Sequence, residues 1–236
     1  MSIEVFCISL NSRIDRRESI NKLFNNLNIK NINWWIVEKH PMGGRYGCFE
    51  SHVGIWKSNI KSDYVIIFED DVKINKNINF QEIISEAKQL CDIYDTVHIS
   101  NIPLKIGKQI KDNWYEGKFL TSLIYMAKRE KLKMLYEKSK QFFGIHVDLF
   151  LSRTSKQVGY ICDNFYQNFD DTDNSWLDNI PFVSILNIEK YIKLNLNKDK
   201  NFLSKIPLWI YEVPIYINIF QHCLIKFIFK NRRINK

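Results

Sequence analysis

The sequence has little of what would place it in a specialised structural class. Its 236 residues include only 8 glycines and 5 prolines, while 14% of them are aromatic. This composition excludes collagen-like, coiled-coil and disordered chains, because each of those has a strong compositional bias that is missing here. A chain of this length can bury roughly 70% of its unfolded surface, so it can form a core without disulfides or metals. We therefore expect an ordinary globular domain.

Cysteine is also scarce, and the five cysteines are scattered, odd in number and never arranged as C-x-x-C. This pattern predicts reduced thiols, mostly in the core. The cysteines are Cys7, Cys48, Cys91, Cys162 and Cys223. A signal-peptide pattern is missing too, because Glu4 and the polar residues from Asn11 onward interrupt the first apolar stretch. The sequence therefore predicts a reducing compartment, most simply the cytoplasm.

The chain is basic, with 34 Lys and Arg against 26 Asp and Glu and a net charge of +8. A nucleic-acid-binding protein is one interpretation of this charge. However, the basic residues are spread along the chain, and no known nucleic-acid-binding motif is present. The abundance of Lys, Asn and Ile also suggests an AT-rich coding sequence, which would raise the charge for other reasons. We predict no nucleic-acid partner.

Short apolar segments alternate with segments of helical periodicity over the first 160 residues. Strands are expected at 4–10, 34–37, 64–68, 96–99 and 120–126, and helices at 14–27, 48–56, 83–90 and from 127 to 136. Two further apolar segments, 147–151 and 158–162, flank a polar turn. The run 64–68 (Y-V-I-I-F) is wholly apolar, as in strands that are buried on both faces. The alternation predicts an α/β fold whose central sheet is mainly parallel.

The segment 207–236 is apolar over most of its length and basic at its end. It carries Glu212 and Pro214 within the apolar part, and a membrane span needs about 20 nearly uninterrupted apolar residues, so a span is excluded. Two interpretations stay open: packing on the core, or lying on a membrane surface. We favour the core, because Pro214 would break an amphipathic helix. The expected division is a main domain at 1–206 and this segment at 207–236.

Three consecutive carboxylates, Glu69, Asp70 and Asp71, directly follow the apolar run 64–68. Such carboxylates repel one another and are costly at the mouth of a sheet unless a positive charge is present. A divalent cation would supply that charge, and ligands of open α/β sheets bind at the carboxyl ends of strands. The group therefore predicts a Mg²⁺ or Mn²⁺ site beside a bound diphosphate. The alternative is a solvated acidic turn.

A second charged group has the opposite sign. Of the eight arginines in the chain, three lie between residues 13 and 17, where a strand is expected to lead into a helix. Guanidinium groups and helix N-termini both bind phosphate oxygens, so this cluster would complement the acidic site. The alternative is a solvated helical turn in which the arginines pair locally with Asp15 and Glu18.

A third feature is the segment 47–52 (G-C-F-E-S-H), in which His52 lies four residues before Trp56 on one face of an expected helix. A histidine there can serve a bound ligand. The alternative is a structural histidine whose ring is satisfied by neighbours in the core, which is the commoner use of a lone histidine on an apolar helix.

Together the segments 8–17 (I-S-L-N-S-R-I-D-R-R), 47–57 (G-C-F-E-S-H-V-G-I-W-K) and 64–72 (Y-V-I-I-F-E-D-D-V) resemble glycosyltransferase family 25. That family includes lipooligosaccharide and procollagen galactosyltransferases. The order and spacing of all three segments match. The resemblance is strong over about the first 75 residues and patchy to about residue 160, where the segment 125–128 departs from the family's Y-x-I-S strand at its serine.

The resemblance implies a GT-A-like fold, a UDP-sugar donor, with galactose or glucose as the sugar, and Mn²⁺-dependent transfer to an acceptor hydroxyl on a glycan or a hydroxylysine-type protein. By the same resemblance, Asp71 is the direct metal ligand, Asp70 assists it, and Glu69 lies nearer the donor ribose. Asn11, Arg13 and Arg17 would lie near the nucleotide and diphosphate, with His52 close by.

An inverting transfer also needs a carboxylate that takes the proton of the acceptor hydroxyl. Our candidate is Asp148, in a segment H-V-D that looks like a later aspartate of the family and whose partial burial would raise the pKa of its carboxyl. The alternative is that Asp148 caps a short helix. The acidic loop 170–173 is a second source of a base. A competing function is a catalytically inactive relative that binds carbohydrate or nucleotide-sugar, since an intact acidic group shows metal-binding capacity without showing turnover.

Overall fold

The computed structural model describes residues 2–74, 78–142, 145–161 and 165–167, all within one compact unit of the chain. The strands are β1 (Ile3–Leu10), β2 (Ile32–Val37), β3 (Tyr64–Glu69), β4 (Val72–Ile74), β5 (Thr96–Lys111), β6 (Trp114–Lys128), β7 (Gln157–Tyr160) and β8 (Phe165–Gln167). The helices are α1 (Ile14–Asn26), α2 (Gly44–Lys57), α3 (Phe80–Leu90), α4 (Arg129–Ser139) and α5 (Val147–Thr154). No described helix is long and apolar enough to cross a membrane.

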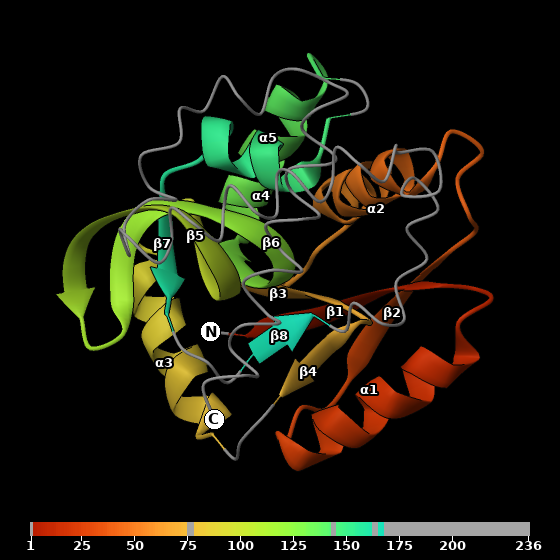
Figure 1. Cartoon of the computed structure of the whole chain (residues 1–236), viewed down its shortest axis with the longest axis horizontal. Helices are drawn as coiled ribbons and strands as arrows, with labels where there is room; N and C mark the ends of the chain where they lie inside the picture. Colours follow the sequence, from red (N-terminus) through yellow and green to blue (C-terminus); the bar gives the residue numbers. More distant parts are fainter. Residues whose placement is uncertain (1, 75–77, 143–144, 162–164, 168–236) are drawn as a thin grey trace, which may run out of the picture. The chain divides into compact units, whose positions relative to one another are not determined.

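Six strands form the main sheet in the order β2-β1-β3-β6-β5-β7 (Figure 1). β1 pairs in parallel with β2 and with β3, and β5 pairs in parallel with β7. β6 is antiparallel to β3, β5 and β7, so among the described strands of this sheet it runs against the rest. β4 and β8 pair separately as a small antiparallel sheet. The predicted α/β class, with a mixed, mainly parallel sheet flanked by helices, is confirmed.

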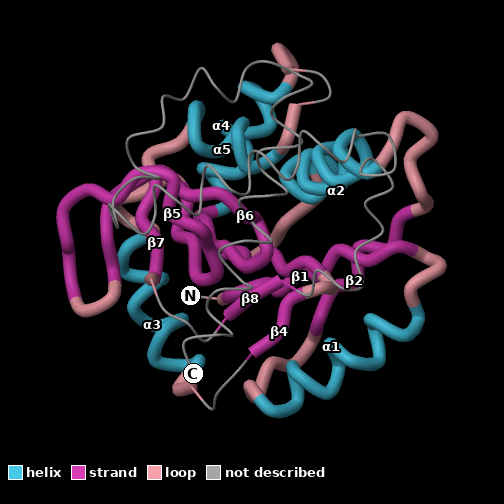
Figure 2. Tube along the Cα trace, in the orientation of Figure 1, coloured by secondary structure: helices cyan, strands magenta, loops and turns pink. Residues whose placement is uncertain are grey.

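Helices cover both faces of this sheet (Figure 2). On one face α1 and α3 pack on side chains such as Phe68 of β3, and on the other face α2, α4 and α5 pack on side chains such as Ile67. Successive residues of a strand point to opposite faces, so a strand buried on both sides must be apolar throughout. The run at 64–68 meets that requirement, and each of its five residues is buried, as expected.

The predicted strand at 96–99 proves too short. β5 extends to Lys111 and forms a long, irregular hairpin with β6, whose register shifts at several points. Residues 105–113 are exposed, so no core imposes an apolar alternation on them. Asn113 holds the turn with a φ of 63°, a conformation that asparagine tolerates better than most residues. Strand pairing across the hairpin therefore defines a structure that the hydrophobic pattern does not show.

The described cysteines are free thiols, with Cys7 and Cys91 buried and Cys48 partly buried, in agreement with the prediction. Cys162, Cys223, the acidic loop 170–173 and the segment 207–236 lie outside the described residues.

Candidate active site

The predicted site residues gather where β1 and β3 end. These two strands are parallel neighbours with Ile8 opposite Glu69, so Ser9 and Leu10 lie at the same edge as Asp70 and Asp71. Helix α1 follows β1 within four residues and brings its first turn to this edge. Neighbouring carboxyl ends of parallel strands are the usual binding place of open α/β sheets. The fold therefore places the acidic group and the arginine cluster next to each other.

Asp70 is buried and ion-paired. The guanidinium Nη1 of Arg16 donates to its Oδ1 over 3.1 Å, and the two side chains are only 10% and 8% exposed. Burial raises the pKa of Asp70, and the hydrogen bonds from Ser9 and Arg16 offset that shift only in part. The second oxygen, Oδ2, is buried with no hydrogen-bond partner among the described residues. A positive ligand at Oδ2 would relieve that cost. Asp71 beside it is also buried.

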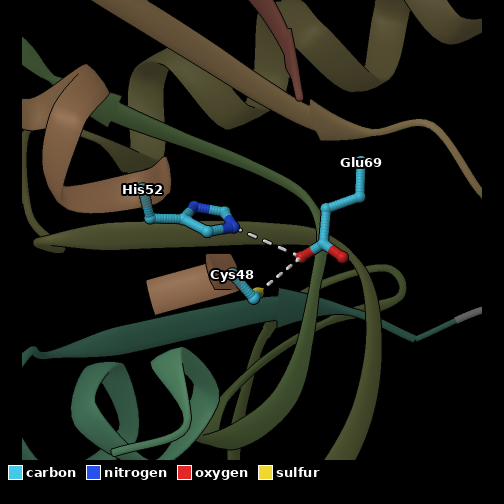
Figure 3. Close-up of side chains that lie close together, drawn as sticks. All are labelled: Cys48, His52 and Glu69. Carbon is cyan, nitrogen blue, oxygen red and sulfur yellow. Dashed lines mark hydrogen bonds and ion pairs between the residues drawn. The ribbon is translucent and has the colours of Figure 1, made fainter. Parts of the chain in front are cut away.

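Glu69, the last residue of β3, receives several donors on one oxygen. Its Oε1 accepts hydrogen bonds from Ser122 of β6 and, over 3.3 Å, from His52 Nε2, and the thiol of Cys48 lies 4.0 Å away (Figure 3). Burial alone would raise the pKa of Glu69, but the hydrogen bonds from His52 and Ser122 and the charge of Arg16 hold that pKa below its ordinary value. Glu69 is therefore ionised at neutral pH.

His52 is fully buried and hydrogen-bonded through both ring nitrogens. Nε2 faces Glu69, and Nδ1 lies 2.9 Å from the hydroxyl of Tyr125, which also accepts the indole N–H of Trp56 over 2.9 Å. His52 is thus satisfied by core neighbours, as the structural interpretation requires. It also contacts a carboxylate of the acidic group, Glu69, and its role toward a bound ligand stays a prediction.

Cys48, His52 and Glu69 together form a group that could hold a metal ion, with one ligand atom from each residue within 4.8 Å of the others. Metal binding needs the thiolate of cysteine. Burial raises the pKa of the Cys48 thiol well above its ordinary value, and the charges of Glu69, Asp148 and Asp71 raise it further. Glu69 Oε1 is also already an acceptor for His52 and Ser122. As it stands, the group is a hydrogen-bonded cluster.

Arg13 and Arg17 of the arginine cluster make local contacts. Arg13 pairs with Asp15 over 2.7 Å. Arg17 donates to Ser9 Oγ and to the backbone carbonyls of Leu10 and Asn11, and so fastens the end of β1 to α1. The side chain of Asn11 donates to Glu38 over 2.8 Å. Asn11, Arg13 and Arg17 thus surround the end of β1, next to the acidic group.

Arg16, which the sequence interpretation passed over, is the arginine that contacts an acidic residue of the site. Its signal was present, because Arg16, Ile20 and Phe24 recur every four residues and are the buried residues of α1. A helical residue in line with two core residues faces the core. Ser9, Ser122 and Tyr125 were also missed as site residues. Ser9 and Tyr125 lie in segments compared with the family, but only the fold shows that each reaches the acidic group or His52 from another element.

Asp148 lies in the first turn of α5, and the residue at the N-cap is His146. The alternative that Asp148 itself caps the helix is therefore wrong. Its charge acts on the thiol of Cys48 and on the hydroxyl of Tyr125, contributing after burial and Glu69 to the raised pKa of each group. The charge of Asp148 thus acts on residues of the cluster around Glu69, although Asp148 belongs to a helix about 80 residues later in the chain.

Three comparisons with known proteins bear on this site. The sequence model of glycosyltransferase family 25, described as an LPS biosynthesis protein family, matches residues 35–165, more than half of the chain. That range contains β3, the acidic group, His52 and Asp148. No protein with a curated description matches the sequence.

Solved structures resemble the fold loosely. A197 from STIV has a TM-score of 0.42 at 16% identity, over 72% of this chain and 87% of that one. Mannose-1-phosphate geranyltransferase from Thermus thermophilus has a TM-score of 0.43 at 7% identity, over 68% and 74%. A UDP-glucose pyrophosphorylase complexed with UDP-glucose has 0.42 at 14%, over 69% and 74%. Similarities of this size say nothing about the reaction.

Proposed function

Because the chain belongs to glycosyltransferase family 25 and is a glycosyltransferase, we propose that it moves a hexose, galactose or glucose, from a UDP-sugar to a hydroxyl of a glycan or protein acceptor. The observation that carries the proposal is the buried, unsatisfied Oδ2 of Asp70, which lies beside Asp71 at the ends of parallel strands. A buried carboxylate oxygen without a donor favours a cation there, and nucleotide-sugars bring a diphosphate that needs one.

Mn²⁺ or Mg²⁺ fits the residues at this place. Both ions prefer oxygen ligands, and Asp70 and Asp71 offer carboxylates whose desolvation only a positive charge repays. When bound, the ion would supply charge neutralisation for the diphosphate as it leaves. Arg16 fixes one oxygen of Asp70 and leaves the other for the ion. Arg17, which contacts Ser9 and Asn11 at the end of β1, and Arg13 four residues before it would serve the diphosphate with charge-assisted hydrogen bonds.

Two further carboxylates take the remaining roles in this proposal. Glu69, held ionised by its neighbours, accepts hydrogen bonds from hydroxyls of the donor. Asp148 takes the proton from the acceptor hydroxyl, whose oxygen then attacks the anomeric carbon from the side opposite the diphosphate. Asp148 suits that role because its charge acts on Cys48, whose thiol neighbours Glu69 of the acidic group.

The test is a screen of UDP-sugars for Mn²⁺-dependent release of UDP, joined to calorimetry of donor binding. Asp71→Ala should weaken metal-dependent donor binding by at least about 100-fold, since it removes a metal ligand. Asp112→Ala, at the exposed tip of the β5–β6 hairpin, is the matched control and should bind as the wild type does.

Unchanged affinity of Asp71→Ala would contradict the metal assignment. Binding of a UDP-sugar without turnover, in the presence of acceptor glycans, would instead support the inactive, carbohydrate-binding alternative.

We further propose that the enzyme acts in the cytoplasm and does not bind a membrane surface. Co-sedimentation with anionic vesicles tests this placement. Strong binding that falls with added salt would indicate instead that Lys230, Arg232 and Arg233 lie among anionic head groups and bring the enzyme to a membrane surface.

A further inference from the structure

Behind Glu69 lies a chain of buried side chains that the proposed reaction does not use directly. The indole of Trp56 is 2.9 Å from the hydroxyl of Tyr125, that hydroxyl is 2.9 Å from His52 Nδ1, and His52 Nε2 is 3.3 Å from Glu69 Oε1. Trp56, Tyr125 and His52 are each at most 1% exposed. Water therefore does not compete for these hydrogen bonds, and their donors and acceptors must match.

The direction of each hydrogen bond follows from the side chain of Trp56, which has one donor and no acceptor. An indole N–H can only donate, so the oxygen of Tyr125 accepts from Trp56. The phenolic proton of Tyr125 must then be donated, and among the described residues its only other partner is His52 Nδ1. Nδ1 is therefore an acceptor, and in a neutral imidazole the proton lies on the other nitrogen. Nε2–H faces the carboxylate of Glu69.

The two carboxylate oxygens of Glu69 therefore have different surroundings. Oε1 of Glu69 takes the hydrogen bonds from His52 and Ser122 and lies near the thiol of Cys48, while no hydrogen bond to Oε2 occurs among the described residues. Figure 3 shows Oε2 directed away from His52 and Cys48. The side chain is 21% exposed, so Oε2 can receive a ligand. Donors gathered on one oxygen stop the carboxylate from rotating and leave the second as a fixed acceptor.

We propose that Trp56 and Tyr125 are positioning residues that hold His52 as its neutral Nε2–H tautomer, so that Glu69 presents Oε2 to the hydroxyl groups of a bound nucleotide-sugar. The ligand in this statement rests on the proposed function, whereas the tautomer does not. The same tautomer disfavours a metal at Cys48, His52 and Glu69, because a metal would need the lone pair of Nε2 that the proton occupies.

The tautomer is tested first, by ¹⁵N-resolved NMR of the imidazole nitrogens of the full chain at neutral pH. The expected spectrum has His52 protonated at Nε2 alone, and in Tyr125→Phe a second population protonated at Nδ1 appears. Tyr94→Phe is the control. Tyr94 is also buried, but its hydroxyl donates to the carboxylate of Glu116 and not to a histidine. It should leave the spectrum of His52 unchanged. A wild-type His52 protonated at Nδ1, or at both nitrogens, would overturn the proposal.

The consequence for the ligand is tested by calorimetry with a UDP-sugar and Mn²⁺. Tyr125→Phe should weaken binding about tenfold, in line with the loss of one buried hydrogen bond, while Tyr94→Phe should not. His52→Gln keeps an amide N–H near the place of Nε2 and should retain most of the affinity, whereas the shorter side chain of His52→Asn should not reach Glu69. Equal affinity of Gln and Asn variants would overturn the positioning role. Wild-type protein that binds no UDP-sugar would overturn the proposed donor, while the spectrum would still decide the tautomer.

Discussion

The acidic end of β3 and the arginine cluster at the start of α1 carry opposite charges and lie at one edge of the sheet, yet they are held differently. Glu69 and Asp70 are bound by residues far away in the chain, since Arg16 is 54 positions from Asp70 and Ser122 is 53 positions from Glu69. Among the described residues, the hydrogen bond of Arg13 to Asp15 spans two positions and that of Arg17 to Ser9 spans eight. Buried charges need partners that only tertiary packing supplies, while more exposed charges can be satisfied by neighbours in sequence.

Two arginines at the start of α1 therefore have different structural roles although they carry the same charge. Arg16 and Arg13 are three residues apart and look alike in the sequence, but one forms a buried ion pair and the other pairs with Asp15, which is 61% exposed. Buried pairs are costly to break, and exposed pairs contribute little. Substitutions at the two positions should therefore change the unfolding free energy by different amounts.

The largest effect is expected for Arg16→Met. Removing this guanidinium leaves the carboxylate of Asp70 buried without its cation, which should cost about 3 kcal/mol of unfolding free energy in urea denaturation. Arg13→Met is the matched control and should cost less stability, because the partner carboxylate of Asp15 is 61% exposed. The double variant Arg16→Met/Asp70→Asn should recover much of the loss. Similar effects at positions 13 and 16 would contradict the distinction between buried and exposed pairs.

A smaller effect is expected for Arg17→Ala. This change removes hydrogen bonds to Ser9 and to the carbonyls of Leu10 and Asn11, so it should lower the unfolding free energy by about 1–2 kcal/mol. If Arg17 also serves the diphosphate, donor binding should weaken, and the deficit should shrink as salt is added. A variant with full donor affinity at low salt would show that Arg17 only fastens the end of β1.

The smallest effect concerns the pair Arg13 and Asp15. The hydrogen bond from Arg13 lowers the pKa of Asp15 from 3.8 to about 2. A lowered folded-state pKa stabilises the fold above pH 3.8, and this contribution disappears as the pH falls through about 2. The pKa measured by NMR titration should therefore return toward 3.8 in Arg13→Ala. It should also rise when a UDP-sugar binds, if Arg13 leaves Asp15 for the diphosphate. A pKa that the ligand does not move would keep Arg13 a local partner of Asp15.

The first half of the fold could be predicted because its signals are local. The strands and helices up to β3 were expected within a few residues of their observed bounds, since apolar periodicity identifies elements that pack on a core. Of the hairpin formed by β5 and β6, the sequence predicted only the two buried strand segments, 96–99 and 120–126. Its exposed part, and the small pair of β4 and β8, are defined by pairing between strands, which leaves no periodic apolar pattern in either strand.

The sequence indicated where the acidic group of the candidate site lies, but it predicted few of the contacts that this group makes. Charged residues that follow an apolar strand indicate an edge of the sheet, so Glu69, Asp70 and Asp71 could be assigned to a site from the sequence. The helical spacing that makes Arg16 a core-facing residue was equally visible, but the family resemblance assigned roles to Arg13 and Arg17 instead. Nothing local linked Tyr125 to His52, because the two are 73 positions apart.

The amino-acid sequence alone specifies the α/β class, the buried central strand and the position of the acidic group, because each depends on the order of apolar and polar residues along a short stretch of chain. The packing of the folded chain settles which arginine meets Asp70, which oxygen of Glu69 is occupied, and how Tyr125 and Trp56 reach His52. Those outcomes depend on strand order and helix packing, which bring distant residues within hydrogen-bonding distance. Inside the core, where water cannot satisfy a polar group, such contacts determine whether the group is stable there.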